Sequence, residues 1–382
     1  MKRIVIALFL VASLAFSTFA GGVSEEPTTL KIGAIFAVTG GASFLGAPEA
    51  NTAKMLVDKI NADGGIDGRQ IELIIKDSAA NPEKAISFAK QLIEEDQVLA
   101  IIGPSTSGET MQIKELCNEA KVPLVSAAAA EAIVEPVAPY VFKTPQKDSY
   151  VVRWIYQTMN ERGISKIGVV AANSGFGNAG RGQLEKYAPE FGIEILISES
   201  YDRAATDLTA LLNKVKAQNV EAVVNWSIVP AQSIIAKNMK QLGMSASLFQ
   251  SHGFGNIRYV EAAGEAANGI IFPCGRLLVA DSLPNSDPQK ALLTQYANDY
   301  ESMFNEDAST FGGHAYDALM IVVEAIKAGG ADRDAIRNEI EKISSFPGTG
   351  GVFNFTAADH NGLGMDSIVM LTVENGEFAL LK

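Results

Sequence analysis

Residues 167–180 read IGVVAANSGFGNAG, and this stretch joins an apolar run to a glycine-rich turn and the start of a helical pattern. The turn matches G-x-G-x-x-G over 175–180, and a second strand-like run follows at 193–197 with Glu199 just beyond it. A strand, a tight turn, a helix and a parallel strand form the βαβ unit of Rossmann-like folds, where this spacing can mark a dinucleotide site. The stretch predicts an α/β fold and raises the hypothesis of a dehydrogenase.

The rest of the chain repeats this alternation of short apolar runs with amphipathic helices. The runs are β-branched and apolar on both faces, which is typical of strands in a parallel sheet that helices cover on both sides. Strands are expected at 30–37, 70–76, 98–102, 122–126, 167–172, 193–198, 222–228 and 269–273, and shorter ones at 352–355, 368–373 and 377–381. Helices are expected at 46–62, 82–95, 289–304, 312–328 and 332–343. The first eight strands divide into two similar halves, 30–126 and 167–273, so the sequence predicts two α/β lobes.

The N-terminus has the three parts of a secretory signal peptide. Lys2 and Arg3 precede an almost wholly apolar run, and Thr18-Phe19-Ala20 offers a small-residue cleavage site. The run is too short for a membrane-spanning helix, and no cysteine follows it that could carry a lipid anchor. We therefore expect residues 1–20 to be a signal peptide and the mature protein to reach the periplasm or the extracellular space. Nicotinamide cofactors are scarce there, which argues against a dehydrogenase.

Composition argues against several other classes of function. The chain has 31 Lys and Arg against 44 Asp and Glu, a formal charge of −13, and such a surface repels phosphate backbones, so no nucleic-acid partner is expected. His252, His314 and His360 lack metal-ligand spacing. We find no G-x-S-x-G, no H-E-x-x-H and no paired carboxylates. The sequence thus predicts no metal, no cofactor and no enzymatic activity.

The two cysteines leave two possibilities open. Cys117 falls in a helical pattern and Cys274 follows a strand. A disulfide could form in an oxidising compartment, but two buried thiols in different parts of the fold are the favoured interpretation.

Three loops after predicted strands are rich in small residues. In open parallel sheets, ligands bind beyond the carboxyl ends of the strands, where loops meet helix N-termini. The loop at 39–46 is glycine-rich, the loop at 103–110 carries the hydroxyls of Ser105 and Ser107, and the loop at 126–130 is mostly alanine. Two adjacent loops of this kind indicate a carboxylate cradle. The alternative is ordinary helix capping by Ser and Thr.

At these residues the chain resembles a known family, the type I periplasmic solute-binding proteins of ABC transporters, and within it the leucine/isoleucine/valine-binding group. The matching pieces run in order over nearly the whole mature chain. They are Ile32-Gly-Ala with Thr39-Gly40, Asn61-Ala-Asp-Gly-Gly-Ile66, Ile102-Gly-Pro-Ser-Thr-Ser107, Phe142-Lys-Thr-Pro145, Gly175-Phe-Gly177, Thr206-Asp-Leu208 and Gly253-Phe-Gly-Asn256.

The resemblance implies two doubly wound Rossmann-like lobes joined by three crossovers, which close on a ligand about a hinge. Lobe 1 would comprise 23–147 plus 275–346, and lobe 2 would comprise 148–274 plus 347–382. The turn at 175–177 would be the family's aromatic-glycine loop, so its glycines would serve a tight turn rather than a dinucleotide.

The resemblance also implies which residues bind the ligand. The serine and the backbone amides that hold the ligand's carboxylate fall on Ser107, Ala128 and Ala130. The aromatic residue of lobe 2 falls on Phe176. One family tyrosine falls on Leu45, beside Phe44, and another falls near Ile228, with Trp226 just before it. These apolar residues would form a hydrophobic pocket, although core packing is an alternative role for them.

One position departs from the family in a way that bears on the ligand. The glutamate that pairs with the ligand's ammonium falls on His252, and an unpaired ammonium in a closed cleft costs several kcal/mol. Of the nearby acids, Glu109, Glu131 and Asp202 do not sit where the family would place a replacement. The sequence therefore favours a small hydrophobic or aromatic carboxylate without an ammonium. A true branched-chain amino acid binder remains an alternative, as does a His252 satisfied by loop backbone outside the cleft.

The leading functional hypothesis is a monomeric binding protein that delivers a solute to the membrane permease of an ABC transporter. A ligand-sensing subunit with the same fold is the second hypothesis, since both would use lobe closure as their output. An enzyme is the third, and no sequence motif supports it.

Overall fold

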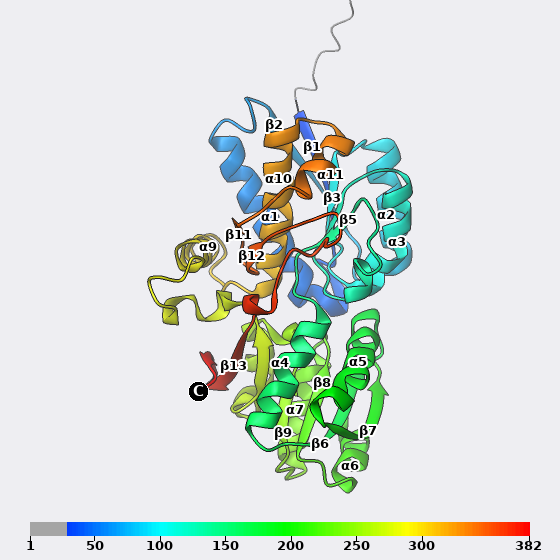
Figure 1. Cartoon of the computed structure of the whole chain (residues 1–382), viewed down its shortest axis with the longest axis vertical. Helices are drawn as coiled ribbons and strands as arrows, with labels where there is room; N and C mark the ends of the chain where they lie inside the picture. The colour runs from blue at the N-terminus through cyan, green and yellow to red at the C-terminus, as the bar shows by residue number, and fades with distance from the viewer. Residues whose placement is uncertain (1–28) are drawn as a thin grey trace, which may run out of the picture.

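The computed structural model describes residues 29–382, so the expected signal peptide at 1–20 lies outside the described residues. Figure 1 shows two lobes, one above the other, each built on its own β-sheet with helices on both faces. The predicted fold class, two doubly wound α/β lobes joined by three crossovers, is confirmed.

The first lobe contains a parallel sheet in the order β2-β1-β3-β4-β5. Its strands are β1 (Thr29–Phe36), β2 (Gln70–Asp77), β3 (Ala100–Ile102), β4 (Leu124–Ser126) and β5 (Val141–Lys143). Its helices are α1 (Ser43–Ala62), α2 (Pro82–Lys90), α3 (Ser107–Glu119), α9 (Lys290–Phe304), α10 (Thr310–Gly329) and α11 (Arg333–Ile340). The core lies on both faces of the sheet, with α10 almost fully buried against one of them.

The second lobe contains a seven-stranded sheet in the order β14-β13-β10-β9-β8-β6-β7. Its parallel strands are β6 (Lys166–Ala172), β7 (Glu194–Tyr201), β8 (Ala222–Trp226), β9 (Ser247–Gln250) and β10 (Ile271–Cys274), and β13 (Val369–Glu374) and β14 (Glu377–Leu380) add an antiparallel edge. Its helices are α4 (Asp148–Glu161), α5 (Gly175–Tyr187), α6 (Thr209–Ala217), α7 (Ala231–Gln241) and α8 (Ile257–Ala263).

The three crossovers follow from the element order. The chain leaves the first lobe between β5 and α4, returns between β10 and α9, and leaves again between β12 (Val352–Phe353) and β13. The strand β12 pairs only with β11 (Phe346–Pro347), outside both large sheets. Phe353, Phe355 and Leu363 pack in the core of the first lobe, which puts the third crossover later in the chain than position 347, where the resemblance placed it.

The predicted strands and helices agree with the structure within a few residues, whereas the strands β5, β9 and β11 were not predicted. The strands β5 and β9 have three and four residues; β3 and β4 are as short, but their apolar runs at 98–102 and 122–126 were recognised. The helix expected at 82–95 is α2 continued by one wider turn at Gln91–Glu95, and Asn81 caps it by accepting hydrogen bonds from the amides of Glu83 and Lys84.

The lobes contact each other in several places, through backbone and side-chain atoms. A Cβ placed on Gly175 of α5 would lie 2.7 Å from the amide nitrogen of Gly108 in α3, so α5 cannot carry a side chain at this position without a shift. Asn256 donates through Nδ2 to the carbonyl of Phe44 at 2.9 Å, and Thr310 donates its amide to the carbonyl of Gly255 at 3.0 Å. These contacts hold the lobes in a closed arrangement.

Candidate ligand-binding cleft

The candidate site is a cavity between the lobes, at the ends of the parallel strands where the two sheets face each other. Its volume is about 20 Å³, which is room for about one water molecule. Its walls are Leu45, Ser105, Ser107, Ala127, Ala128, Ala129, Pro145, Phe176, Ile228, His252, Gly253, Phe311 and His314. Seven of the ten residues that the sequence placed at a ligand site are therefore neighbours around one small cavity.

The other three expected residues do not line this cavity. Phe44 packs its ring on Tyr259, with 5.3 Å between the centroids. Trp226 is fully buried and lies behind Phe176, at 5.7 Å between the ring centroids. Ala130 lies behind the cavity wall, where its amide donates a hydrogen bond to Ser107 Oγ. For Phe44 and Trp226, the core-packing alternative describes what the side chain does.

The wall from the first lobe presents a serine hydroxyl at the start of a helix. Ser107 Oγ accepts from the amide of Ala130 at 3.1 Å and keeps its own hydrogen to donate. The amide of Ala128 donates to Ser126 Oγ at 3.1 Å. Thr106, not Ser107, caps α3 by accepting from the amide of Glu109. Ser107 is thus free of the capping role, and its hydroxyl together with the positive end of α3 suits an anion.

Ser105 lines the same cavity, but its hydroxyl is engaged behind it. Its Oγ accepts from the amide of Ala37 at 2.9 Å and makes a short hydrogen bond with the carboxyl of Glu49. Glu49 is fully buried, and burial raises its pKa to about 8, with the Ser105 hydrogen bond opposing the rise and Glu109 adding to it. Glu49 is therefore mostly protonated at pH 7 and supports the loop without a charge.

The glycines of the 175–180 turn each have a packing reason. A Cβ on Gly177 would lie 1.9 Å from the carbonyl oxygen of Ala172, and a Cβ on Gly180 would lie 2.1 Å from the indole of Trp226. Gly175 contacts the first lobe, as described above. The turn brings Phe176 into the cavity wall, so the apparent dinucleotide fingerprint is a packing requirement of the cleft.

His252 forms the end of the cavity that lies in the second lobe. Its ring meets Phe176 edge to face at 5.3 Å and Trp226 at 5.8 Å, between centroids. The residue lies inside the cleft, so it is not a loop histidine satisfied elsewhere. Burial and the nearby charge of Lys143 hold its pKa well below the usual range, and the imidazole is neutral at pH 7.

An acid that the sequence reasoning missed lies beside this histidine. Asp148, the first residue of α4, has Oδ1 at 3.8 Å from His252 Nε2. Because His252 is neutral, this contact is not an ion pair. Burial raises the pKa of Asp148 to about 7, while Lys143 opposes the rise. The three acids considered from the sequence serve elsewhere: Glu109 bonds Thr106, Glu131 accepts from the amide of Ser149, and Asp202 is exposed.

Lys143 is the buried cation of this region. Its Nζ donates to the backbone carbonyls of Ala129, Pro145 and Gln146 at 2.8, 2.8 and 3.1 Å. Burial lowers its pKa to about 8, and Asp148 partly offsets this. The lysine therefore joins the alanine loop of the cavity to the first crossover, and it places a positive charge close to His252 and His314.

Several buried polar atoms at this end of the cleft have no hydrogen-bond partner within residues 29–382. They are both ring nitrogens of His252, Oδ1 of Asp148 and Nδ1 of His314. Burial and Lys143 lower the pKa of His314 to about 3, so this ring is also neutral. Unsatisfied buried polar groups are uncommon in native proteins, and four such atoms beside one cavity indicate that the site is built to hydrogen-bond something that enters it.

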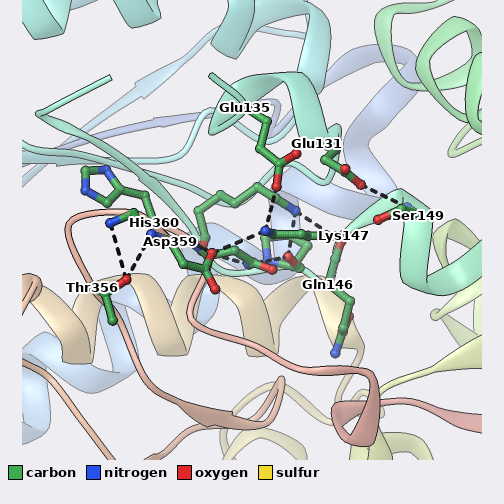
Figure 2. Close-up of polar contacts among 12 residues, drawn as sticks. Glu131, Glu135, Gln146, Lys147, Ser149, Thr356, Asp359 and His360 are labelled. Atoms are coloured by element: carbon green, nitrogen blue, oxygen red, sulfur yellow. Dashed lines mark hydrogen bonds and ion pairs between the residues drawn. The ribbon is translucent and has the colours of Figure 1, made fainter. Parts of the chain in front are cut away.

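Charged residues surround the first crossover, and one of them bonds from the first lobe to the second (Figure 2). Lys147 contacts Glu135 at 2.6 Å and Asp359 at 3.3 Å. Glu131 of the first lobe accepts from the amide of Ser149 at 3.0 Å and so caps α4 of the second lobe. The hinge region is therefore held by polar contacts as well as by the chain itself.

A larger hollow lies at the mouth of the cleft. Its volume is about 600 Å³, and Phe176 and Ile228 belong both to its lining and to that of the inner cavity. Loops of both lobes form its walls, among them residues 79–80, 173–176 and 202–206. The larger hollow therefore adjoins the inner cavity at Phe176 and Ile228.

The remaining sequence expectations concern metals, thiols and membranes. Among residues 29–382, no group of three His, Cys, Asp or Glu side chains could hold a metal ion. Cys117 and Cys274 are free and buried, so the disulfide that the sequence left open is not formed, and burial raises both thiol pKa values to about 12. In the same part of the chain, no helix is long and apolar enough to cross a bilayer.

Comparison with known proteins gives one family. The family described as "Periplasmic binding protein" matches residues 29–377. A leucine-, isoleucine-, valine-, threonine- and alanine-binding protein of Pseudomonas aeruginosa is 26% identical over 332 residues, which covers 86% of each chain.

Two solved structures are similar over almost the whole chain. An extracellular ligand-binding receptor from Rhodopseudomonas palustris HaA2 superposes with a TM-score of 0.87 at 25% identity, covering 92% of this chain and 99% of the other. The branched-chain amino acid transporter substrate binding protein LivJ from Streptococcus pneumoniae, in complex with isoleucine, gives 0.82 at 28% identity, covering 92% and 97%.

Proposed function

The chain belongs to the periplasmic binding protein family, and from that premise we propose that it captures a small hydrophobic or aromatic carboxylate between its lobes. After export, it would deliver this solute to the membrane permease of an ABC transporter, and it would perform no chemistry on it. Relatives named for leucine, isoleucine and valine binding support the transport role.

The observation that carries the proposed ligand class is the neutral His252 in the cavity wall. Ser107 offers a hydroxyl and a helix N-terminus to a carboxylate at the other wall. An ammonium beside His252 would face an uncharged imidazole, and Lys143 is near enough to lower the pKa of both histidines. Burying a cation there without a dedicated partner costs several kcal/mol, whereas a carboxylate with an apolar body avoids that cost.

A specific observation favours the alternative, a branched-chain amino acid. Asp148 Oδ1 is buried, has no partner among the described residues and lies 3.8 Å from His252. If Asp148 is ionised, it could replace the family's glutamate as the partner of an ammonium. Lys143 already offsets this charge, which is why the carboxylate proposal takes precedence.

Calorimetry with matched pairs of ligands separates the two proposals. The protein is first freed of bound solute by unfolding and refolding, and leucine is then compared with 4-methylpentanoate, and phenylalanine with 3-phenylpropionate. A residual penalty of about 1.4 kcal/mol on the ammonium gives about a tenfold preference for the deaminated acid. His252→Glu should move the preference toward the amino acids. Tight binding of leucine by the wild type, with no binding of the acids, would contradict the proposal.

A further inference from the structure

We propose that the solute carries a hydroxyl on the carbon next to its carboxylate, and that His252, oriented by Asp148, is the acceptor that binds this hydroxyl. The ligand class is then a 2-hydroxy acid with an apolar side chain. This inference rests on the proposed function and narrows its substrate.

The first step in the argument is the hydrogen-bonding capacity left open at one end of the cavity. Neither ring nitrogen of His252 has a partner within residues 29–382, and neither has Oδ1 of Asp148. Both side chains are at most 4% exposed. A buried donor or acceptor without a partner costs about 1–3 kcal/mol, so a polar group of the ligand at this position satisfies atoms that the protein leaves open.

The second step is the distance along the ligand. Ser107 and His252 line the same cavity, and its volume is about 20 Å³. Because both residues line so small a cavity, a carboxylate at Ser107 and a polar group at His252 must lie close together on the solute, and the carbon next to the carboxylate gives the shortest separation. The apolar body of the solute extends beyond this cavity, which has room for about one water molecule.

The third step is the charge of the ligand group. The imidazole is neutral, and Lys143 and Asp148 offset each other beside it. A hydroxyl donates one hydrogen bond and brings no charge, so it needs no counter-ion in this environment. An ammonium would need one, and a plain methylene would leave His252 unsatisfied.

The fourth step is the orientation of the ring. A neutral imidazole has one donor and one acceptor nitrogen, and its neighbour decides which is which. Asp148 Oδ1 lies on the Nε2 side of His252, at 3.8 Å, which is beyond hydrogen-bond length. No hydrogen bond holds the ring elsewhere, so a small rotation brings Nε2–H onto the carboxylate. Nδ1 then becomes the acceptor for the ligand hydroxyl.

The test is a series of three ligands that differ at one position. Leucine, 2-hydroxy-4-methylpentanoate (each enantiomer separately) and 4-methylpentanoate are titrated by calorimetry into protein freed of bound solute, and alanine, lactate and propionate repeat the series at smaller size. We expect one enantiomer of the hydroxy acid to bind at least about tenfold more tightly than the deoxy acid. This comparison uses only the wild type, so it does not depend on the folding of a variant.

Two variants then assign the preference to the residues. His252→Phe keeps an aromatic ring against Phe176 and Trp226, and it should remove the preference for the hydroxyl, so that 2-hydroxy-4-methylpentanoate and 4-methylpentanoate bind this variant with the same affinity. Asp148→Asn should reduce the ratio of the affinities for the hydroxy acid and the deoxy acid. A purely structural role of Asp148 would not change this ratio.

The outcomes are distinguishable. If the acids bind but the hydroxyl gives no preference, or if His252→Phe keeps the preference, the inference is overturned and the proposed function stands. If only leucine and alanine bind, the inference and the proposed ligand class are both wrong.

Discussion

Replacing Gly175 by alanine should weaken ligand binding without weakening the fold. Gly175 is the first residue of α5, with the helix cap formed by Ser174, so its backbone accepts alanine readily. The added Cβ would lie 2.7 Å from the amide nitrogen and 2.8 Å from the Cα of Gly108 in the other lobe. These are backbone atoms that cannot turn aside, so the lobes must stay slightly apart.

The size of the effect follows from this contact. Forcing one methyl group into packed surroundings costs about 1–3 kcal/mol, and here only the closed arrangement bears that cost. Affinity should therefore fall by about 5- to 150-fold, while the melting temperature of the ligand-free protein stays the same or rises. Gly182→Ala is the matched control, since it lies in the same helix and its Cβ would meet nothing within 4 Å.

Calorimetry gives the affinities, and small-angle scattering with and without ligand gives the closure. Gly175→Ala should show a smaller decrease in radius on binding than the wild type and Gly182→Ala. If Gly175→Ala binds and closes like the wild type, the glycine contact between the lobes does not belong to the ligand-bound state, and the reasoning fails.

Three further predictions concern single side chains. Ser107→Ala should weaken carboxylate binding by about 1–3 kcal/mol, because it removes a hydrogen bond to a charged group; wild-type affinity in calorimetry would contradict the assigned role. Glu49 has its pKa raised to about 8 by burial, so the folded state holds a proton that the unfolded state releases above about pH 4.5, and this contribution to stability is lost as pH rises through 8. Gln does not titrate, so the melting temperature of Glu49→Gln minus that of the wild type should increase as pH rises from about 5 to 8. A difference that does not change with pH would refute this. Cys117 and Cys274 should react with a thiol reagent only after unfolding, since both are buried with pKa values near 12; rapid reaction of the native protein would show that a thiol is accessible.

The sequence predicted the parts of the fold that depend on local pattern. The eight-residue strand β1 and the seven-residue strand β6 are long enough for apolar runs to be recognised, and Asn81 before Pro82 marks a helix start. The strand β5 is too short to have a pattern of its own. It exists because its neighbour β4 and the buried Lys143 hold it in place.

The site residues that belong to a recognisable local motif could be predicted from the sequence. Those that only the packing of distant elements brings to the site could not. Ser107, Phe176 and His252 come from loops with recognisable small-residue motifs. Asp148 looks in the sequence like any acid in the first turn of a helix, which the helix dipole favours. Its place beside His252 depends on how α4 packs in the second lobe, and Glu131 and Lys143 of the first lobe lie close to it. His314 reaches the same region from the long helix α10 of the first lobe.

The three hydrogen bonds of Lys143 have a mechanical consequence. One carbonyl belongs to Ala129 in the wall of the cavity. The other two, from Pro145 and Gln146, belong to the first crossover between β5 and α4. A single side chain, with no other in between, therefore connects the wall of the cavity to the first crossover. Replacing Lys143 would thus remove support from the cavity wall and from the crossover at once.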